Sequence, residues 1–503
     1  MTYLPTVPSD DEKYAYSTPN GRWIGFVGAI GLTTFAVTSI SFISKHPALL
    51  GYGVFCLIYF ANVGFCAIGA WFARNFNALE HEQVRSRFSD YVPTVDVYLP
   101  NCGEDIQVLV NQFKAVKQLD YPNFKVYVLD DAGRDEVRIA AELHSFEYMS
   151  RPNKGELKKA GNMRHAFARS QGALILVFDA DFAPRPDFLA ETVAYFARNP
   201  KLAILQTPQY FQSTPEQTAI ANGATFLQEV FYRLIQNFRN AWGASVCCGS
   251  NAIYRREALA PHGGAAAVER SEDVNTGMMV LRDGWTIEYL PLCLAKGLSP
   301  DTVKGFFNQQ YRWCSGSKHL ITSRQFWTQP NVNLLTKFSY VLSILYYSTS
   351  GLGILCFPLP SLINVWFYPQ DLSAGNYSLV FPAIAVSIIA RGVWAKNRWG
   401  LPVLTTSIAA SYAHLSGIID VLGGNVAPWV PTGATGAKST KYDRFIRMIA
   451  FIPPALLALM VLGLAIHDVP WRSETVPLLW MSLQVVLSWL VLREIRTELE
   501  DCG

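Results

Sequence analysis

The sequence predicts an α/β domain inserted into a polytopic α-helical membrane protein. Half of the 503 residues are hydrophobic and only 16% are charged, a composition typical of a membrane protein with a soluble part. Long apolar runs occur near both ends of the chain, and from about 92 to 305 short β-rich runs alternate with helical patterns. The net charge of +3 and the high apolar content argue against a disordered or nucleic-acid-binding protein.

Two membrane spans are predicted near the N-terminus. Residues 23–43 and 47–73 carry no charge, and each is long enough to cross a hydrocarbon core of about 30 Å. A signal peptide is disfavoured for the first, because the preceding segment is acidic, the run is too long and no small-x-small cleavage site follows. We therefore expect residues 1–22 to form a cytosolic tail.

Four further spans are predicted after residue 335, at 338–366, 378–395, 445–466 and 475–493. The segment 401–422 is apolar but carries His414, Asp420 and many hydroxyl groups, which favours a helix lying at the membrane interface. Six spans place both termini and the central domain on one side of the membrane. Seven spans, the alternative, would place the basic loop 436–447 on the other side.

Basic residues indicate the orientation of these spans. With six spans, nine basic residues lie on one side of the membrane, and the positive-inside bias makes that side cytosolic. They are Arg74, Arg85, Arg87, Lys438, Lys441, Arg444, Arg447, Arg493 and Arg496. We expect an integral protein of the cell membrane, plasma or inner, with a cytosolic central domain.

The expected organisation follows from these patterns. In order it comprises the tail 1–22, two spans in 23–73, the central domain 92–320, an interfacial segment and two spans in 321–397, the interfacial helix and a loop in 401–440, two spans in 445–493 and a tail 494–503.

The nine cysteines include one vicinal pair, Cys247 and Cys248, and no C-x-x-C spacing, so neither a zinc site nor a disulfide framework is indicated.

Carboxylates follow two predicted strands of the central domain. The strand 124–131 ends in Asp130 and Asp131, and the strand 173–181 ends in Asp179-Ala180-Asp181, while 94–100 is a third clear strand. Ligands of open α/β sheets bind at the carboxyl ends of the strands, so the two groups suggest one shared site. The D-x-D spacing suits Mg²⁺ or Mn²⁺ bridging a diphosphate, although surface turns are also rich in Asp.

Three other motifs allow two interpretations each. Lys159 lies in "KKAGN", where it could meet phosphate as a point charge or belong to a solvated basic helix face. Glu272 and Asp273 precede a helical pattern. They could provide a general base for an acceptor hydroxyl, or they could be acids that cap the helix. Trp313, in "QQYRW" at 309–313, taken alone reads as an interfacial anchor near lipid.

Taken together, these motifs resemble those of processive family 2 glycosyltransferases, the group of cellulose, curdlan, chitin and hyaluronan synthases. The resemblance covers roughly residues 20 to 470. Its motifs, in order, are Asp130-Asp131, Lys159–Asn162, the D-x-D at 179–181, "CCGS" at 247–250, Glu272-Asp273 and the Q-x-x-R-W at 309–313. Such enzymes have a cytosolic GT-A domain, which the resemblance implies for residues 92–320.

The resemblance also implies roles for individual residues. Asp273 would be the catalytic base, and Asp179 and Asp181 would hold Mg²⁺ or Mn²⁺. The nucleotide sugar would be bound by Glu104, Asp130, Asp131, Lys159, Asp179, Gln309, Arg312 and Thr432. The acceptor end of the glycan at a channel entrance would meet Cys248, Gly249, Ser250, Glu272 and Trp313, the last as an aromatic platform. "APWVPTGATGAK" at 427–438 resembles a gating loop over the nucleotide, with Trp429, Val430 and Thr432 as its contacts.

Some residues depart from the cellulose synthase pattern. "PNCGE" at 100–104 replaces P-T-Y-N-E, so Cys102 stands where an aromatic residue is expected. Phe182 replaces the histidine of D-x-D-H, and Cys247 replaces a phenylalanine of F-F-C-G-S. These departures make a 1,3-linked or mixed-linkage β-glucan as credible a product as cellulose.

The resemblance implies a membrane-embedded, processive and inverting transferase that polymerises a UDP-sugar, with UDP-glucose expected, into a β-glucan and translocates it. One alternative is the transfer of a single sugar to a lipid carrier, which needs neither the Q-x-x-R-W motif nor a channel. Another is synthesis of a different β-linked polymer, such as mannan, chitin or hyaluronan. A transporter would leave the carboxylates at the strand ends unexplained. The expected partners are the growing glycan and the lipid bilayer. Nucleic acid is not an expected partner.

Overall fold

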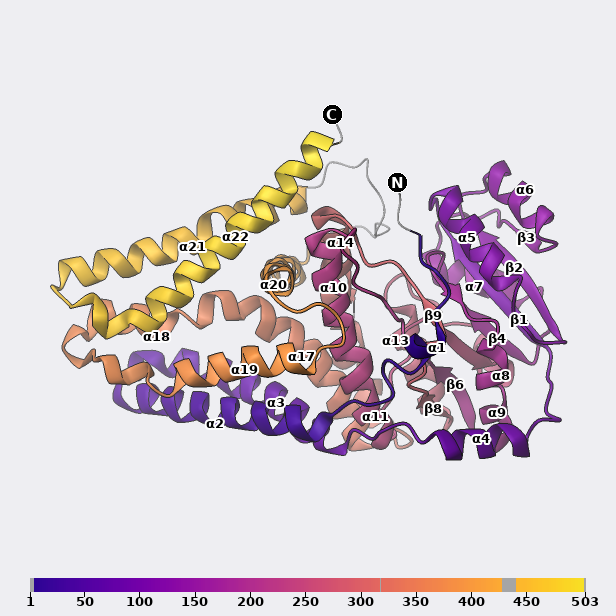
Figure 1. The fold of residues 1–503 in the computed structure, drawn as a ribbon, viewed down its shortest axis with the longest axis horizontal. Coiled ribbons are helices and arrows are strands. Elements are labelled where there is room, and N and C mark those ends of the chain that lie inside the picture. Colours follow the sequence, from indigo (N-terminus) through magenta and orange to yellow (C-terminus); the bar gives the residue numbers. More distant parts are fainter. Residues whose placement is uncertain (1–3, 317, 428–439, 502–503) are drawn as a thin grey trace.

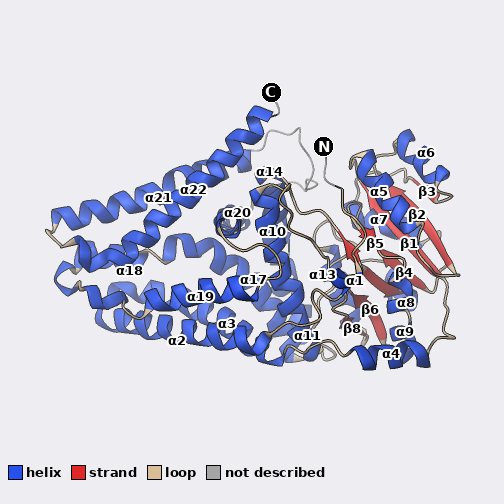
Figure 2. Cartoon of the chain, viewed as in Figure 1, coloured by secondary structure: helices blue, strands red, loops and turns tan. Residues whose placement is uncertain are grey.

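The computed structural model describes residues 4–316, 318–427 and 440–501. A bundle of long helices occupies one end of the elongated molecule, and a domain built on a β-sheet occupies the other (Figure 1). Figure 2 shows the strands of the described chain confined to the second part. This arrangement confirms the predicted α/β domain between two sets of apolar helices.

The larger sheet has seven strands in the order β3-β2-β1-β4-β7-β6-β8. They are β1 Val95–Asn101, β2 Phe124–Asp130, β3 Glu147–Met149, β4 Leu174–Val177, β6 Leu202–Gln206, β7 Ala252–Arg255 and β8 Thr286–Tyr289. The strands β1 to β4 are parallel, and β7 runs antiparallel to both β4 and β6. Because β2 and β4 flank β1, the residues that follow them emerge at one edge of the sheet.

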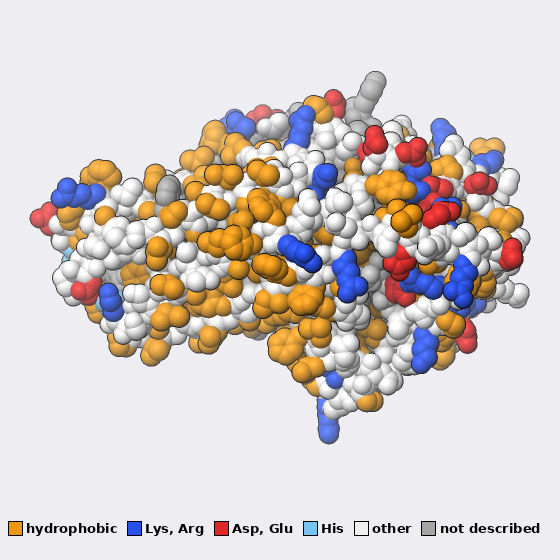
Figure 3. All heavy atoms as spheres, turned by 60° about the horizontal axis from the view of Figure 1, so that its bottom comes forward, with side chains coloured by type: hydrophobic (Ala, Val, Ile, Leu, Met, Phe, Trp, Pro, Cys, Tyr) orange, Lys and Arg blue, Asp and Glu red, His pale blue; other side chains and the backbone are white. Residues whose placement is uncertain are grey.

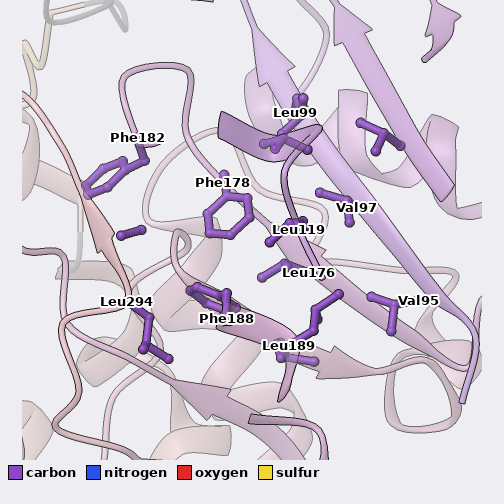
Figure 4. Close-up of a cluster of buried hydrophobic side chains, with 14 of the residues drawn as sticks. Val95, Val97, Leu99, Leu119, Leu176, Phe178, Phe182, Phe188, Leu189 and Leu294 are labelled. Carbon is purple, nitrogen blue, oxygen red and sulfur yellow. The ribbon is translucent and has the colours of Figure 1, made fainter. Parts of the chain in front are cut away.

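The sheet is buried on both faces. Val95, Val97 and Leu99 of β1 lie in one core with Phe178 (Figure 4), whereas Tyr98 lies in a second core on the opposite face. The first core is completed by α5 Ile106–Val116, α6 Asp135–Leu143, α8 Phe188–Thr192 and α9 Ala194–Arg198, and the second by α7 Lys158–Phe167, α12 Arg256–Leu259 and α13 Glu272–Arg282. Burial on both faces explains the continuous apolar run of β4.

One predicted strand is shorter than expected. The sequence suggested a strand over 173–181, but β4 ends at Val177. Its neighbour β7 begins at Ala252, and beyond this pair the backbone N–H of Asp179 donates to Ser250 Oγ at 2.8 Å instead of to a strand. The D-x-D residues therefore lie on a turn, which leads into a two-stranded sheet of β5 Ala183–Pro184 and β9 Ala295–Lys296.

Six helical segments of the described chain are long and apolar enough to cross a membrane, the number predicted. They are Gly21–Lys45 (α2), Pro47–Phe72 (with α3 Leu50–Phe72), Leu334–Phe367 (α17 Leu334–Cys356 and α18 Leu359–Phe367), Ala374–Trp394 (with α19 Val380–Trp394), Thr440–Ile466 (α21) and Trp471–Glu500 (with α22 Thr475–Asp501). Hydrophobic side chains cover the bundle surface in Figure 3, while acidic and basic side chains gather over the sheet domain. Such an apolar surface suits contact with lipid.

The helix α20, Leu401–Gly423, is not among these six segments. Figure 1 shows it end-on, whereas α17, α19 and α21 run across the picture, so it crosses the bundle at the end nearest the sheet. It packs against α10 Ala219–Glu229, α14 Val303–Gly316 and α17. Its location at the membrane interface stays a prediction.

The N-terminal segment packs against the sheet domain, although the sequence suggested only a tail. Residues 10–13 form the short helix α1, in which Lys13 Nζ lies 2.8 Å from Asp187 Oδ2 and 2.9 Å from Glu191 Oε1. Glu12 pairs with the buried Lys296 of β9 at 2.6 Å. Buried ion pairs of this kind tie the segment to the same β5-β9 ladder that follows the D-x-D turn.

Candidate active site

The carboxyl ends of the strands open into a large cavity of about 2520 Å³. It continues from the sheet domain past α14 and between the apolar helices of the bundle. Predicted site residues that line it are Glu104, Asp131, Lys159, Asp179, Asp181, Cys248, Glu272, Asp273, Gln309, Arg312 and Trp313. Aromatic residues of the bundle that line it include Phe35, Tyr59, Tyr346, Tyr347 and Trp480. Residues that are distant in the sequence thus line the same cavity.

The D-x-D turn concentrates negative charge in this cavity. Burial raises the pKa of Asp181 to about 7, and the nearby carboxylates of Asp179 and Glu104 add to the rise. Burial also raises the pKa of Glu104, whose carboxylate accepts a hydrogen bond from the Cys102 backbone N–H at 2.6 Å. A cation bound at this turn would favour the charged form of these carboxylates.

Lys159 provides positive charge beside this turn. Its Nζ donates to Asp179 Oδ1 and to the carbonyl oxygen of Gly249 at 2.9 Å, and it lies 3.9 Å from Glu272 Oε1. Burial by itself lowers the pKa of Lys159, but the carboxylates of Asp179 and Glu272 outweigh burial and hold that pKa above its usual value. The lysine is therefore a permanently charged group at the site, positioned by three separate segments.

Asp273 and Glu272 begin helix α13 at the wall of the same cavity. Burial raises the pKa of Asp273 to about 7, and the adjacent Glu272 carboxylate raises it further. Asp273 Oδ1 accepts a hydrogen bond from the Val274 N–H at 2.8 Å. The other oxygen, Oδ2, faces Gly249. Ser271 is the N-cap of α13, so Asp273 is an acid of the first helical turn, and its position in the cavity wall also allows the role of a base.

The "CCGS" segment, 247–250, lies beside Asp273 and Lys159. Gly249 has a φ of +77°, and Ser250 is fully buried with its hydroxyl accepting the Asp179 N–H. The Cys248 N–H donates to Gln206 Oε1 at 2.7 Å. Cys248 lines the cavity, whereas Gly249 and Ser250 support it through their backbone and hydroxyl groups.

The two aspartates after β2 have different surroundings. Asp130 is fully buried, and its carboxylate accepts the N–H groups of Ala132 and Arg134 at 3.0 and 2.6 Å, which organises the following loop. Asp131 lines the cavity and forms a buried bidentate ion pair with Arg151, with N–O distances of 2.6 and 2.9 Å. The structure thus brings Asp131, not Asp130, to the cavity.

Sequence reasoning missed Arg151 and Asn101. Arg151 is almost completely buried and also donates to the carbonyl oxygens of Glu156 and Lys158, so it shapes the loop before Lys159. Asn101, the last residue of β1, lines the cavity with neither side-chain polar atom bonded to the described residues. Its position between the ends of β2 and β4 is the sequence signal that could have indicated it.

Helix α14 presents "QQYRW" on two faces. Gln309, Arg312 and Trp313, at i, i+3 and i+4, line the cavity. Tyr311 points to α20, where its hydroxyl donates to Asp420 Oδ2 at 2.6 Å. Burial lowers the pKa of the Arg312 guanidinium, an effect that Glu272 and Asp179 oppose. The Q-x-x-R-W spacing thus matches the helix face that borders the cavity.

The predicted gating-loop contacts Trp429, Val430 and Thr432 lie outside the described residues. The segment is bordered on its N-terminal side by Ala427, whose N–H donates to the Tyr311 hydroxyl at 3.0 Å. Their proposed roles stay predictions.

Asp179 and Asp181 fit a divalent cation held together with a diphosphate. Within the described residues no group of three His, Cys, Asp or Glu side chains is arranged to hold a metal by itself. Mg²⁺, however, is commonly bound by one or two carboxylates and completed by substrate phosphates. Burial, together with the nearby carboxylates, raises the pKa of Asp181, and a bound cation would favour its charged form.

Comparison with known proteins assigns the central domain. Residues 96–263 match the model of glycosyl transferase family 2. This part of the chain is therefore similar to family 2 glycosyltransferases. Its seven-stranded sheet is accordingly a GT-A-like α/β fold.

Several curated relatives of the chain are cellulose synthases. Cellulose synthase 2 of Novacetimonas hansenii is 28% identical over 427 residues, covering 78% of this chain and 26% of that protein. The UDP-forming catalytic subunit of Pseudomonas fluorescens SBW25 is 34% identical over 281 residues, covering 53% and 38%. That of Komagataeibacter xylinus is 30% identical over 325 residues, covering 62% and 43%. The chain therefore spans less than half the length of these relatives.

Among solved structures, the chain is similar to a mannosyltransferase of Pyrobaculum calidifontis in complex with GDP-mannose and Mn²⁺. The TM-score is 0.49 and the identity 17%, with 74% of this chain and 98% of that chain covered.

Proposed function

We propose that the protein is a membrane-embedded, processive and inverting glycosyltransferase that polymerises UDP-glucose into a β-glucan and moves the product across the membrane. The observation that carries this proposal is the single cavity that joins Asp179 and Asp273 to Trp313 and then continues between the apolar helices. A donor site, an acceptor platform and an exit route would then follow one another along one path.

The donor would bind at the D-x-D turn. In this proposal Asp179 and Asp181 hold Mg²⁺ or Mn²⁺, and Lys159 neutralises the diphosphate as a point charge. When bound, the cation would stabilise the negative charge of the leaving diphosphate. Asp131, fixed by Arg151, and Glu104 would border the nucleoside. Asn101, buried and unbonded among the described residues, offers a further donor and acceptor there.

The acceptor would react at Asp273. A hydroxyl oxygen of the glycan end attacks the anomeric carbon, the bond from that carbon to the phosphate oxygen breaks, and the hydroxyl proton passes to Asp273. Attack opposite the leaving group inverts the α-linked donor to a β-linked product. A carboxylate with a pKa of about 7 is suited to accept this proton at neutral pH.

UDP-glucose is proposed because two of the relatives are UDP-forming cellulose synthase catalytic subunits. The departures at Cys102, Phe182 and Cys247 keep a 1,3-linked or mixed-linkage glucan as the alternative linkage. We place the catalytic domain in the cytosol because the basic residues and the UDP-sugar donor both favour that side.

Incubation of membranes containing the protein with radiolabelled UDP-glucose tests this function. We expect the native chain to form insoluble labelled polymer. Membranes that contain Asp273→Asn should form none. Label in a lipid fraction would instead indicate transfer to a carrier, and no incorporation would contradict a transferase that uses this donor. Linkage analysis of polymer made by purified protein would then assign cellulose or a related glucan.

A further inference from the structure

A buried histidine connects α20 to the "QQYRW" helix. His414 is fully buried on α20, and each ring nitrogen has a partner on a different helix. Nε2 lies 3.0 Å from Gln310 Oε1 of α14, and Nδ1 lies 2.9 Å from Ser350 Oγ of α17. Gln310, the residue between Gln309 and Tyr311, is itself buried at the cavity wall. No role has been assigned above to either side chain.

The protonation state of His414 follows from its partners and its burial. Burial lowers the pKa of His414 to about 3, so the ring is neutral at physiological pH and has a single N–H. A carboxamide oxygen only accepts hydrogen bonds, so Nε2 carries the hydrogen toward Gln310 and Nδ1 accepts the Ser350 hydroxyl. This arrangement fixes both the tautomer and the orientation of the ring.

The same hydrogen bond fixes the orientation of the Gln310 carboxamide. With its oxygen bound to His414, the amide nitrogen is directed to the other side, where it lies 3.4 Å from Gln309 Oε1. Gln309 in turn lines the cavity one helical turn from Trp313. A flipped Gln310 would direct its oxygen at Gln309 Oε1, which would place two acceptors together.

His414 also supports aromatic side chains of the cavity wall. The rings of Tyr346 and Tyr347 contact it edge-on, with centroid distances of 5.8 and 5.0 Å. Both tyrosines line the cavity where it passes from α14 toward the bundle. One buried side chain therefore contacts three residues that line the same cavity as Trp313.

We propose that His414 is a positioning residue that orients Gln310 and, through it, the acceptor end of the glycan beside Trp313. This inference rests on the proposed polymerase function. If the acceptor is held less well, water should compete for the donor sugar, so free sugar should be released at the expense of polymer. A role in folding alone would lower both products together and leave their ratio unchanged.

The experiment compares His414→Leu, which removes the N–H, with His414→Gln, whose amide nitrogen can donate from nearly the position of Nε2. Polymer, free glucose and UDP affinity are measured on monodisperse purified protein with UDP-glucose as the donor. We expect His414→Leu to lower the ratio of polymer to free glucose by about tenfold with unchanged UDP affinity, because small displacements at a reacting centre are costly. His414→Gln should recover most of that ratio.

Thr406→Val is the matched control. Thr406 is a buried residue of the same helix, and its hydroxyl bonds no other described residue. Its substitution should leave the ratio unchanged. A second comparison uses Gln310→Leu: adding His414→Leu to that variant should change the ratio little further, because the two side chains act through one hydrogen bond.

An unchanged ratio in His414→Leu would overturn the inference, as would a His414→Gln variant as impaired as His414→Leu. Independent effects of His414→Leu and Gln310→Leu would also overturn it. If His414→Leu does not yield monodisperse protein, Gln310→Leu and His414→Gln test the inference without it. The ratio of polymer to free glucose should then be lowered in Gln310→Leu and largely retained in His414→Gln, and any other result would overturn the inference. Failure of the proposed function itself would appear separately, as a native chain that forms no polymer in the same assay.

Discussion

Gly249 packs against Asp273 in the candidate active site. A β-carbon added to Gly249 would lie 2.9 Å from the Asp273 β-carbon and 3.2 Å from Asp273 Oδ2. The glycine also has a φ of +77°, a conformation that other residues rarely adopt. The backbone of "CCGS" and the proposed base therefore depend on each other for their positions.

Gly249→Ala should impair catalysis by displacing Asp273. We expect turnover to fall by about tenfold or more, because a shift of about 1 Å at a catalytic group is costly. Gly243→Ala is the control, since Gly243 has a φ of +66° but a β-carbon there would meet no atom within 4 Å. Initial rates and thermal unfolding of both variants are the measurements. Equal losses of turnover would show that backbone strain, not contact with Asp273, matters.

Asp273→Asn should abolish polymer synthesis while UDP-sugar binding survives. Loss of a general base costs about two to four decades of rate. Asparagine keeps an oxygen for the Val274 N–H, so the first turn of α13 should be little affected. Single-turnover rates and calorimetric UDP binding test this together. Near-normal turnover would leave capping as the role of Asp273.

Polymer synthesis should increase with pH, with a midpoint at about 7. Because the pKa of Asp273 is raised to about 7, the carboxyl is protonated and unable to accept a proton below that pH, and it is competent above it. Glu272→Gln removes the neighbouring negative charge and should move the midpoint of the kcat/KM profile to lower pH. Asp181 titrates in the same range, so UDP binding is measured over the same pH series. An unmoved midpoint in Glu272→Gln would contradict the assignment to Asp273.

Activity should require Mg²⁺ or Mn²⁺. Chelation should abolish synthesis and added metal should restore it, whereas Asp181→Ala should not be rescued by metal, since one of two carboxylate ligands is lost. Binding of UDP with and without metal provides a readout that does not depend on turnover. Full synthesis in excess chelator would refute the prediction.

Trp313→Ala should reduce elongation by well over tenfold, since an aromatic platform contributes about 1–3 kcal/mol and sets the geometry of attack. Trp313→Phe and Trp313→Tyr should retain part of the activity. If Trp313 only anchored the protein at the lipid interface, membrane yield would fall slightly and activity per folded molecule would be normal. Polymer formed per mole of monodisperse protein, with UDP binding on the same sample, separates the two cases.

The sequence by itself determined the six apolar helices, the main strands and the face of α14 that carries Gln309, Arg312 and Trp313. These features depend on composition and on periodicities of two and 3.6 residues, which are local properties of the chain. The carboxylates after β2 and β4 were predictable for the same reason, because parallel strands present their ends at one edge.

Only the tertiary structure decided which of these side chains meet and what fixes them. Asp131 is paired with Arg151, twenty positions later, and His414 reaches Gln310 from a helix about a hundred residues away. The N-terminal segment, which the sequence suggested to be a tail, bonds Lys296 of β9. Hydrogen bonds and burial between distant segments depend on how the helices and strands pack, and no local pattern records that packing. The pKa values of Asp181 and Asp273 follow from the same packing, because burial and neighbouring carboxylates raise them.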